Sequence, residues 1–247
     1  WFDWFWKDTV VDAPALIVDP PNGRRPALTE EAKLARAYNV AHEHDSAATV
    51  ESGDRCLSRG VFGMMMPTAY NNGKLIVQSP GYVMIHSEMI HNARIIPIDA
   101  GPHLDEIITQ WEGDPRGRWE GNTLIIESTN FKYVPNMRAP GTGGPGNAPQ
   151  HTGRKMVETF TFVDENTLRY TLTVDDPATY TAPWTVAFPS APVTWVARSA
   201  TYARTGTTWS SGTSGKTRCS GSTRPTTFRS SPASYVPHPA NRPACWA

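Results

Sequence analysis

The chain has 247 residues, 39% of them apolar, with 23 basic and 23 acidic side chains, so its formal net charge is zero. This length and apolar content suit one β domain with extensions, and zero net charge argues against a nucleic-acid or membrane-surface partner. No run of about 20 apolar residues occurs, which excludes insertion into a membrane as a helix.

Acidic residues stop at Asp176, so residues 177–247 hold seven basic side chains and no acid. Such an asymmetry marks a compositional boundary. We therefore expect a β domain at residues 55–189, followed at 190–247 by a Ser/Thr/Arg-rich tail that is disordered or non-native.

Residues 1–54 are expected to form an N-terminal extension that contains one helix. The chain begins with the aromatic run Trp1 to Trp6, which is predicted to pack on the β domain or to contact another protein. The helix is predicted from Glu30 to about Glu43, because Thr29 can cap it and Glu30 and Glu31 suit the positive end of the helix dipole.

Short turns between β-forming runs dominate the rest of the chain. Asn72-Gly73, Pro80-Gly81, His91-Asn92 and Gly121-Asn122 predict hairpins that join residues 67–71 to 74–78, 74–78 to 82–90, 82–90 to 93–98, and the two central strands. A loop at residues 164–166 aligns the apolar faces of 155–163 and 167–175, and residues 183–188 form a last strand. Strands joined by such short loops are antiparallel.

The predicted fold class is therefore mainly β, an antiparallel up-and-down meander with an N-terminal helix. A lipocalin-like barrel or a strongly curled sheet is the expected form, and a two-sheet sandwich is the alternative.

Titratable side chains gather at residues 86–91, where His86 and Glu88 share a strand face. A His-x-Glu pair can bind a metal or combine an acid with a base. The side chain of His91 would point to the opposite face of the strand, so it can lie beside His86 and Glu88 only if a β-bulge intervenes. We name Glu88, His91 and the loop residue His103 as catalytic candidates, and His86 with Glu88 as weak metal candidates.

Glu158 alternates with Met156 and Phe160 on a face that should be apolar. A carboxylate there must be paired, hydrogen-bonded or protonated. Arg94 is its expected partner. A structural ion pair and a catalytic acid or base in a pocket both remain open for Glu158.

Aromatic side chains are abundant along the predicted strands. Arg118 and Trp119 can stack on an aromatic or anionic ligand, although such pairs also clamp loops. If aromatic residues face inward, the cavity suits a small apolar molecule; core packing is the other explanation. The predicted ligand-binding residues are Tyr70, Tyr82, Arg94, Arg118 and Trp119.

The chain has no GxSxG elbow, phosphate loop, GxGxxG or HExxH segment, so we expect no cofactor. The first functional hypothesis is a protein that binds a small apolar or aromatic ligand. The second is an acid–base enzyme, a hydrolase or isomerase, that uses Glu88 or Glu158 with His91 or His103. The third is a structural protein that docks through its aromatic N-terminus.

Several motifs carry a family resemblance. These are LIVDPPNGR at 16–24, DRC at 54–56, EMIHNARIIP at 88–97, GRWEGNTL at 117–124, and DP at 176–177 with PWT at 183–185. Over residues 10–188 the chain resembles an abundant family of uncharacterised, usually exported bacterial proteins. The resemblance implies a shared fold and a periplasmic or secreted location, and it implies no activity.

After the PWT strand, members of that family continue with a Tyr-x-Cys-His-Glu-like segment. Residues 190–247 contain nothing similar. We therefore hypothesise that the tail is an out-of-frame or foreign sequence. In that case Cys56 has lost the disulfide partner that the resemblance implies, and the barrel has lost one edge strand.

Overall fold

The structure of the chain is a computed structural model. It describes residues 15–47, 49–68, 71–137, 149–164, 167–190 and 193–197. The aromatic run at 1–6, Tyr70, and the tail beyond residue 197 lie outside the described residues.

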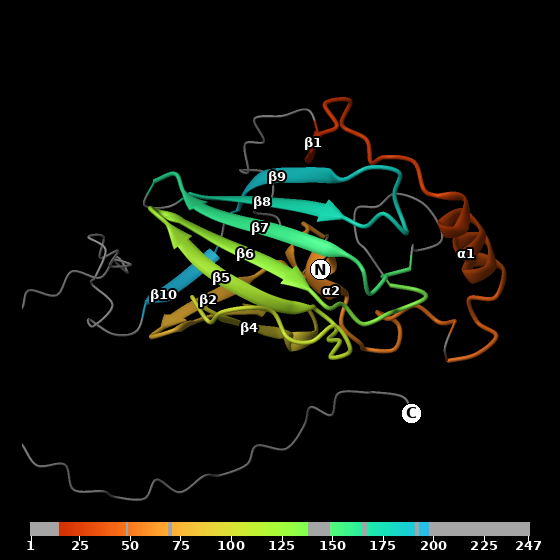
Figure 1. The fold of residues 1–247 in the computed structure, drawn as a ribbon, viewed down its shortest axis with the longest axis horizontal. Coiled ribbons are helices and arrows are strands. Elements are labelled where there is room, and N and C mark those ends of the chain that lie inside the picture. The colour runs from red at the N-terminus through yellow and green to blue at the C-terminus, as the bar shows by residue number, and fades with distance from the viewer. Residues whose placement is uncertain are drawn as a thin grey trace, which may run out of the picture. The chain divides into compact units, whose positions relative to one another are not determined.

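Two β-sheets make up the described part of the chain (Figure 1). The first sheet is antiparallel, in the order β1 (Ile17–Asp19), β9 (Trp184–Ser190), β8 (Leu168–Asp175), β7 (Lys155–Phe162), β6 (Thr123–Thr129) and β5 (Asp114–Glu120). The second has the order β10 (Val193–Ala197), β2 (Lys74–Ser79), β3 (Tyr82–Ser87) and β4 (Ala93–Pro97).

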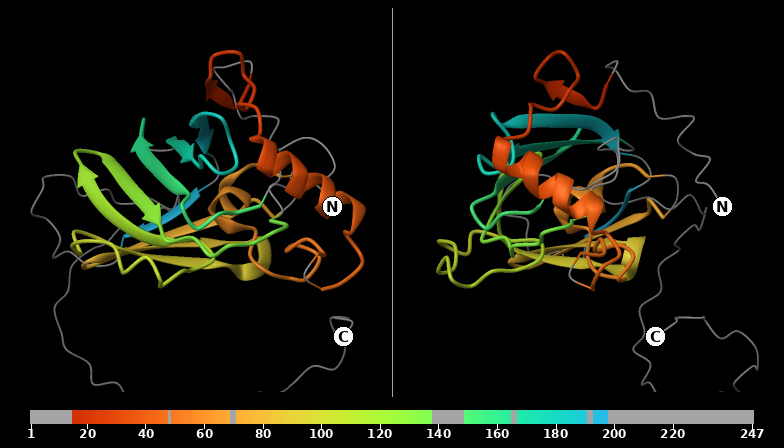
Figure 2. Two further views of the ribbon diagram at one scale, coloured as in Figure 1. Left: turned by 45° about the vertical axis from the view of Figure 1, so that its right-hand side comes forward. Right: turned by 90° about the vertical axis from the view of Figure 1, so that its right-hand side faces the viewer.

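The mainly β class is confirmed, but the sheets do not close into the predicted lipocalin-like barrel. Between β4 and β5 the described residues make one isolated parallel bridge, from Ile98 to Gly117, because a loop of 16 residues (98–113) separates the two strands. The core lies between the sheets, where Ile85 and Ile96 of the second belong to one cluster with Leu124 and Phe160 of the first. Figure 2 shows the two layers.

Most of the predicted hairpins are confirmed. Glu120 pairs with Thr123 across Gly121-Asn122, and Ser79 pairs with Tyr82 across Pro80-Gly81. Gly81 and Gly121 have φ values of 76° and 60°, the left-handed backbone that these turns require. Met156 pairs with Val174 and Phe160 with Tyr170, so the predicted apolar faces of 155–163 and 167–175 do align.

The hairpin predicted at Asn72-Gly73 is wrong. Of the predicted strand at 67–71, the described residues 67, 68 and 71 carry no strand. The Asn72 side chain instead closes a loop on Thr68, accepting from its N–H at 2.7 Å and donating to its carbonyl at 2.7 Å.

The two-residue turn predicted at His91-Asn92 is also wrong. Strand β3 ends at Ser87, and a 3-10 turn η2 (Met89–His91) follows, with Ile90 and His91 at φ values of 60° and 54°. With this longer connection Ile85 pairs with Arg94, whereas a two-residue turn at His91-Asn92 would have paired Met89 with Arg94.

The sequence reasoning missed β10 and the helix α2 (Gly60–Met65). It ended the strand pattern at Pro189, whereas β10 follows two residues after β9 and pairs with β2 in parallel. Helix α2 contributes Val61, Met64 and Met65 to the core.

The predicted N-terminal helix is confirmed as α1 (Glu30–Ala41), with Thr29 Oγ1 accepting from the Ala32 N–H at 3.1 Å. Ala32 and Asn39 face the domain, whereas Leu34 and Tyr38 are exposed. A hollow of about 450 Å³ runs along this helix, lined by Leu28, Lys33, Arg36, Ala37, Val40 and Ala41.

Candidate functional site

A buried ion pair joins the two sheets. Arg94 on β4 donates to Glu158 on β7 through both terminal nitrogens, at 3.0 and 2.5 Å. The side chains are 1% and 0% exposed. Tyr170 on β8 donates its hydroxyl to the same carboxylate at 2.9 Å. The ion pair expected from the alternation of residues 156–160 is therefore present.

Strand parity explains why these three groups meet. Arg94 is opposite Ile85, which is fully buried, and Glu158 is opposite Ile126 and Leu172. All of these side chains therefore point into the space between the sheets. A charged residue is tolerated there because its counter-charge reaches it from the other sheet.

The buried groups affect each other's ionisation. Burial by itself disfavours the charged form of Arg94, but the Glu158 carboxylate outweighs this and raises the pKa of Arg94 above its ordinary value. Burial raises the pKa of Tyr170 well above its ordinary value of 10.0, and the negative charge of Glu158 adds to the shift. Arg94 is thus held charged and Tyr170 neutral.

Three half-buried polar side chains, Ser58, Asn92 and Glu112, lie beside this ion pair. We call this group the polar edge. Asn92 Nδ2 donates to Glu112 Oε1 at 2.6 Å and to Ser58 Oγ at 2.9 Å. Ser58 also donates to Glu112 Oε1. The Glu112 carboxylate lies close enough to Arg94 to contribute to its raised pKa.

The ion pair includes one buried donor without a partner among the described residues, and Arg59 Nε and Ser87 Oγ nearby also lack one. Arg94 Nε is buried and makes no hydrogen bond. The Oε2 atom of Glu112 receives no hydrogen bond in the described part of the chain, since both of this carboxylate's contacts are to Oε1. Arg94 Nε is a hydrogen-bond donor, and Glu112 Oε2 is an acceptor.

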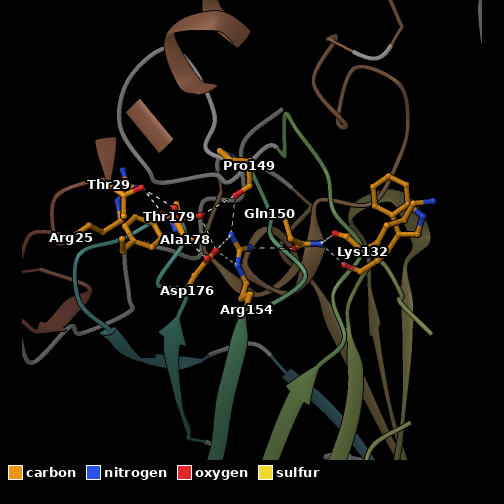
Figure 3. Close-up of polar contacts among 11 residues, drawn as sticks. Arg25, Thr29, Lys132, Pro149, Gln150, Arg154, Asp176, Ala178 and Thr179 are labelled. Carbon is orange, nitrogen blue, oxygen red and sulfur yellow. Dashed lines mark hydrogen bonds and ion pairs between the residues drawn. The ribbon is translucent and has the colours of Figure 1, made fainter. Parts of the chain in front are cut away.

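A second polar network closes the end of the domain beside α1 (Figure 3). Arg154 donates to Asp176 through Nε at 2.8 Å and to the Pro149 carbonyl at 3.1 Å. Thr179 donates to Asp176 at 2.9 Å, and Thr29 donates to the Ala178 carbonyl at 2.8 Å. These bonds fix the start of α1 to the connection between β8 and β9.

Gln150 links the second network to the polar edge. It accepts from Arg154 at 3.3 Å and donates to the carbonyls of Trp111 and Lys132 at 3.1 and 3.0 Å. Trp111 directly precedes Glu112, so both networks hold the same short stretch of backbone. The groups of the second network satisfy one another, which is the pattern of a structural clamp.

His103 belongs to a third cluster, around Asp114 at the start of β5. His103 Nδ1 is 3.1 Å from Asp114 Oδ2, the Leu104 N–H donates to that same oxygen at 2.9 Å, and Arg116 donates to Oδ1 at 2.6 Å. The imidazole is 28% exposed. A carboxylate on Nδ1 orients a histidine so that Nε2 faces outward, which is the arrangement of a general base.

The other catalytic and metal candidates do not converge. His86 is half-buried on β3, Glu88 is exposed and accepts from the Gly73 N–H at 3.1 Å, and His91 is exposed on the 3-10 turn. The described residues contain no group of three or more His, Cys, Asp or Glu side chains placed to hold a metal ion.

The predicted ligand-binding residues also lie apart from Arg94. Arg118 is exposed and pairs with Glu127 and Glu120, which raise its pKa. Trp119 packs against the core, and Tyr82 is 51% exposed at the start of β3. Tyr70 lies outside the described residues.

Five site residues were missed by the sequence analysis: Ser58, Asn92, Glu112, Asp114 and Tyr170. Tyr170 had a usable signal, because the predicted pairing of 155–163 with 167–175 places its side chain beside Glu158. Ser58 and Glu112 had none, since both stand in irregular segments whose positions depend on packing between distant parts of the chain.

The fold and these contacts define a two-sheet β protein with a charged group at its core and a half-buried polar edge. No family model, curated protein or solved structure matches the chain. None of the described helices is both long enough and apolar enough to cross a membrane.

Proposed function

We propose that the chain binds a small aromatic or apolar molecule that carries a hydroxyl group, at the polar edge of Ser58, Asn92 and Glu112. The observation that carries this proposal is the half-buried Glu112 carboxylate, which bonds to Ser58 and Asn92 through Oε1 alone and lies close enough to Arg94 to contribute to its raised pKa. A hydroxyl group can donate a hydrogen bond to Glu112 Oε2, the carboxylate oxygen that neither Ser58 nor Asn92 contacts.

The summed charge of the side chains at this site favours a neutral ligand. Arg94 contributes one positive charge, and Glu158 and Glu112 contribute two negative charges, so the three side chains together carry −1. A carboxylate or phosphate would add to this excess, whereas an O–H group adds no charge.

A ligand can reach the polar edge more easily than the ion pair itself. Glu158 and Tyr170 are fully buried, whereas Ser58, Asn92 and Glu112 are half-buried. Behind the edge, the sulfur of the buried core residue Met64 lies 3.3 Å from Asn92 Nδ2, so the polar edge borders apolar packing. Binding sites commonly combine apolar walls with a few polar groups.

Three probes of one shape test the proposal by isothermal titration calorimetry: 2-naphthol, 2-methoxynaphthalene and 2-naphthoate. A hydrogen bond to a charged group is worth about 1.5–3 kcal/mol, so 2-naphthol should bind about tenfold or more tightly than the methoxy compound. The naphthoate should bind weakest. Equal affinities for the first two probes, or no binding by any, would refute the proposal.

A matched pair of variants locates the site. Glu112→Gln keeps an oxygen for Ser58 and Asn92 but replaces the free acceptor with a donor, so the preference for naphthol should disappear. Glu127→Gln changes a carboxylate on β6 that pairs with the exposed Arg118, and it should leave the preference intact.

Acid–base catalysis is a second candidate, favoured by the contact between His103 and Asp114. Hydrolysis of neutral aryl esters that is lost in His103→Gln and kept in Glu88→Gln would support it. Equal rates in the two variants would count against it.

We also propose that the chain is periplasmic or secreted and belongs to the family that its motifs resemble. The support is the resemblance over residues 10–188. Fractionation of cells that carry the native gene checks the location, and recovery only from the cytoplasm would contradict it.

A further inference from the structure

The loop between β4 and β5 exposes large aliphatic side chains at residues 104–108, which we call the loop tip. Ile107 is 85% exposed, Ile108 is 47% exposed and Leu104 is 42% exposed. Single exposed aliphatic residues are common, but three within five residues concentrate apolar surface on one short segment.

Hydrogen bonds anchor the loop tip to the rest of the domain. Asn130 Nδ2 donates to the carbonyls of Leu104 and Asp105, both at 3.0 Å, and Asp114 accepts from the Leu104 N–H at 2.9 Å. Within the tip, the Ile107 N–H donates to the Asp105 side chain at 3.0 Å and the Ile108 N–H to the Asp105 carbonyl at 2.9 Å.

This anchoring matters for binding. A surface that is ordered before it meets a partner loses little conformational entropy on association. Rigid apolar anchors at the centre of an interface typically carry most of its binding free energy.

The loop itself is acidic, and the cations that contact it, Arg116 at Pro102 and Lys132 at Trp111, lie at its two ends rather than at the tip. Residues 99–112 include Asp99, Asp105, Glu106 and Glu112, with no Lys or Arg. Asp105 and Glu106 are exposed and directly precede Ile107. A complementary surface therefore has an apolar pocket with basic side chains at its rim.

We propose that the loop tip is a docking surface for a protein partner, with Ile107 filling an apolar pocket whose rim carries Lys or Arg. The acidic residues set the charge of the partner and weaken contact with anionic surfaces. This inference does not depend on the ligand proposed at the polar edge.

The test uses the full chain and two dye-labelled helical peptides, one built only from Leu and Lys and the other only from Leu and Glu, followed by fluorescence anisotropy. We expect the Leu–Lys peptide to bind, and its affinity to fall as NaCl increases from 50 to 300 mM. The Leu–Glu peptide should not bind. No binding of the Leu–Lys peptide to the full chain would overturn the proposal.

Two isoleucine variants distinguish binding at the loop tip from nonspecific hydrophobic binding elsewhere on the chain. Ile107→Ser should weaken binding of the Leu–Lys peptide about tenfold or more, from the apolar area lost. Ile95→Ser is the matched control, because Ile95 is 54% exposed on β4, and it should bind like the unaltered chain. Because Ile107 is so exposed, its variant should keep the melting temperature of the unaltered chain.

Removing charge gives the complementary result. Asp105→Asn with Glu106→Gln keeps the acceptor for the Ile107 N–H, and it should reduce the salt dependence of binding. Unchanged binding of the Leu–Lys peptide to Ile107→Ser would overturn the proposal. Sedimentation with phosphatidylcholine vesicles that depends on Ile107, without peptide binding, would overturn it in favour of a membrane surface.

Discussion

Removing one partner of the buried ion pair tests how the two sheets are joined. In Arg94→Met, Glu158 keeps the Tyr170 hydroxyl but loses both guanidinium bonds, of 3.0 and 2.5 Å. Glu158 is fully buried, so the carboxylate is left without a counter-charge in the core. Breaking such a pair from one side costs about 3–5 kcal/mol. A folded domain has only about 5–15 kcal/mol of stability, so this variant should be marginal.

Replacing the whole group separates the pair from the space that it fills. The triple variant Arg94→Met, Glu158→Leu and Tyr170→Phe keeps side chains of similar volume and leaves none of their polar atoms unpaired. Apolar replacement of buried pairs is often neutral or stabilising. We therefore expect the triple variant to recover most of the stability that Arg94→Met loses.

Urea unfolding followed by circular dichroism at 25 °C measures both changes, with the slope against urea as a check on two-state behaviour. Arg118→Met is the surface control, and it should change the free energy of unfolding by less than about 1 kcal/mol because exposed pairs contribute little. A triple variant as unstable as Arg94→Met would refute the reasoning. It would mean that packing, not unpaired charge, sets the cost.

Two further predictions concern residues around the same core. The pKa of Tyr170 lies well above its ordinary value of 10.0, so above about pH 10 the unfolded chain loses a proton that the folded chain keeps. Stability should therefore fall as pH rises past 10, and stability curves of Tyr170→Phe at pH 9–11 should show a smaller fall; equal slopes would contradict this. Gly113→Ala should cost at least about 2 kcal/mol more than Gly121→Ala in urea unfolding, because a Cβ at 113 would stand 2.5 Å from the Thr129 carbonyl, whereas at 121 it meets no atom within 4 Å. Equal losses in the two alanine variants would rule out this steric account.

Local chemistry was enough to predict two of the hairpins with glycine turns, although the same signal at Asn72-Gly73 predicted a hairpin that does not form. Pro80-Gly81 and Gly121-Asn122 require a left-handed backbone that glycine adopts freely, so turn type and register followed from a few residues. The turn after β3 could not be predicted in the same way. Its left-handed residues are Ile90 and His91, and the segment is held by Glu88, which accepts from the distant Gly73.

The candidate site was half predictable for a similar reason. Glu158 stood out because it breaks an apolar alternation, and Arg94, a long cation on another predicted strand, was the natural partner. Glu112 and Ser58 gave no such signal, because they are brought together by contacts between a loop and the segment before α2. Strand β10 was missed because its partner, β2, lies more than 100 residues earlier in the chain.

The parallel pairing of β10 with β2 has a consequence for shortened forms of the chain. A version that ends at Pro189 would leave the backbone N–H and C=O groups along one side of Lys74–Ser79 without their strand. An uncovered edge of this kind recruits strands from other molecules. Truncation at the compositional boundary would therefore favour self-association and fibre-like aggregates rather than a smaller soluble domain.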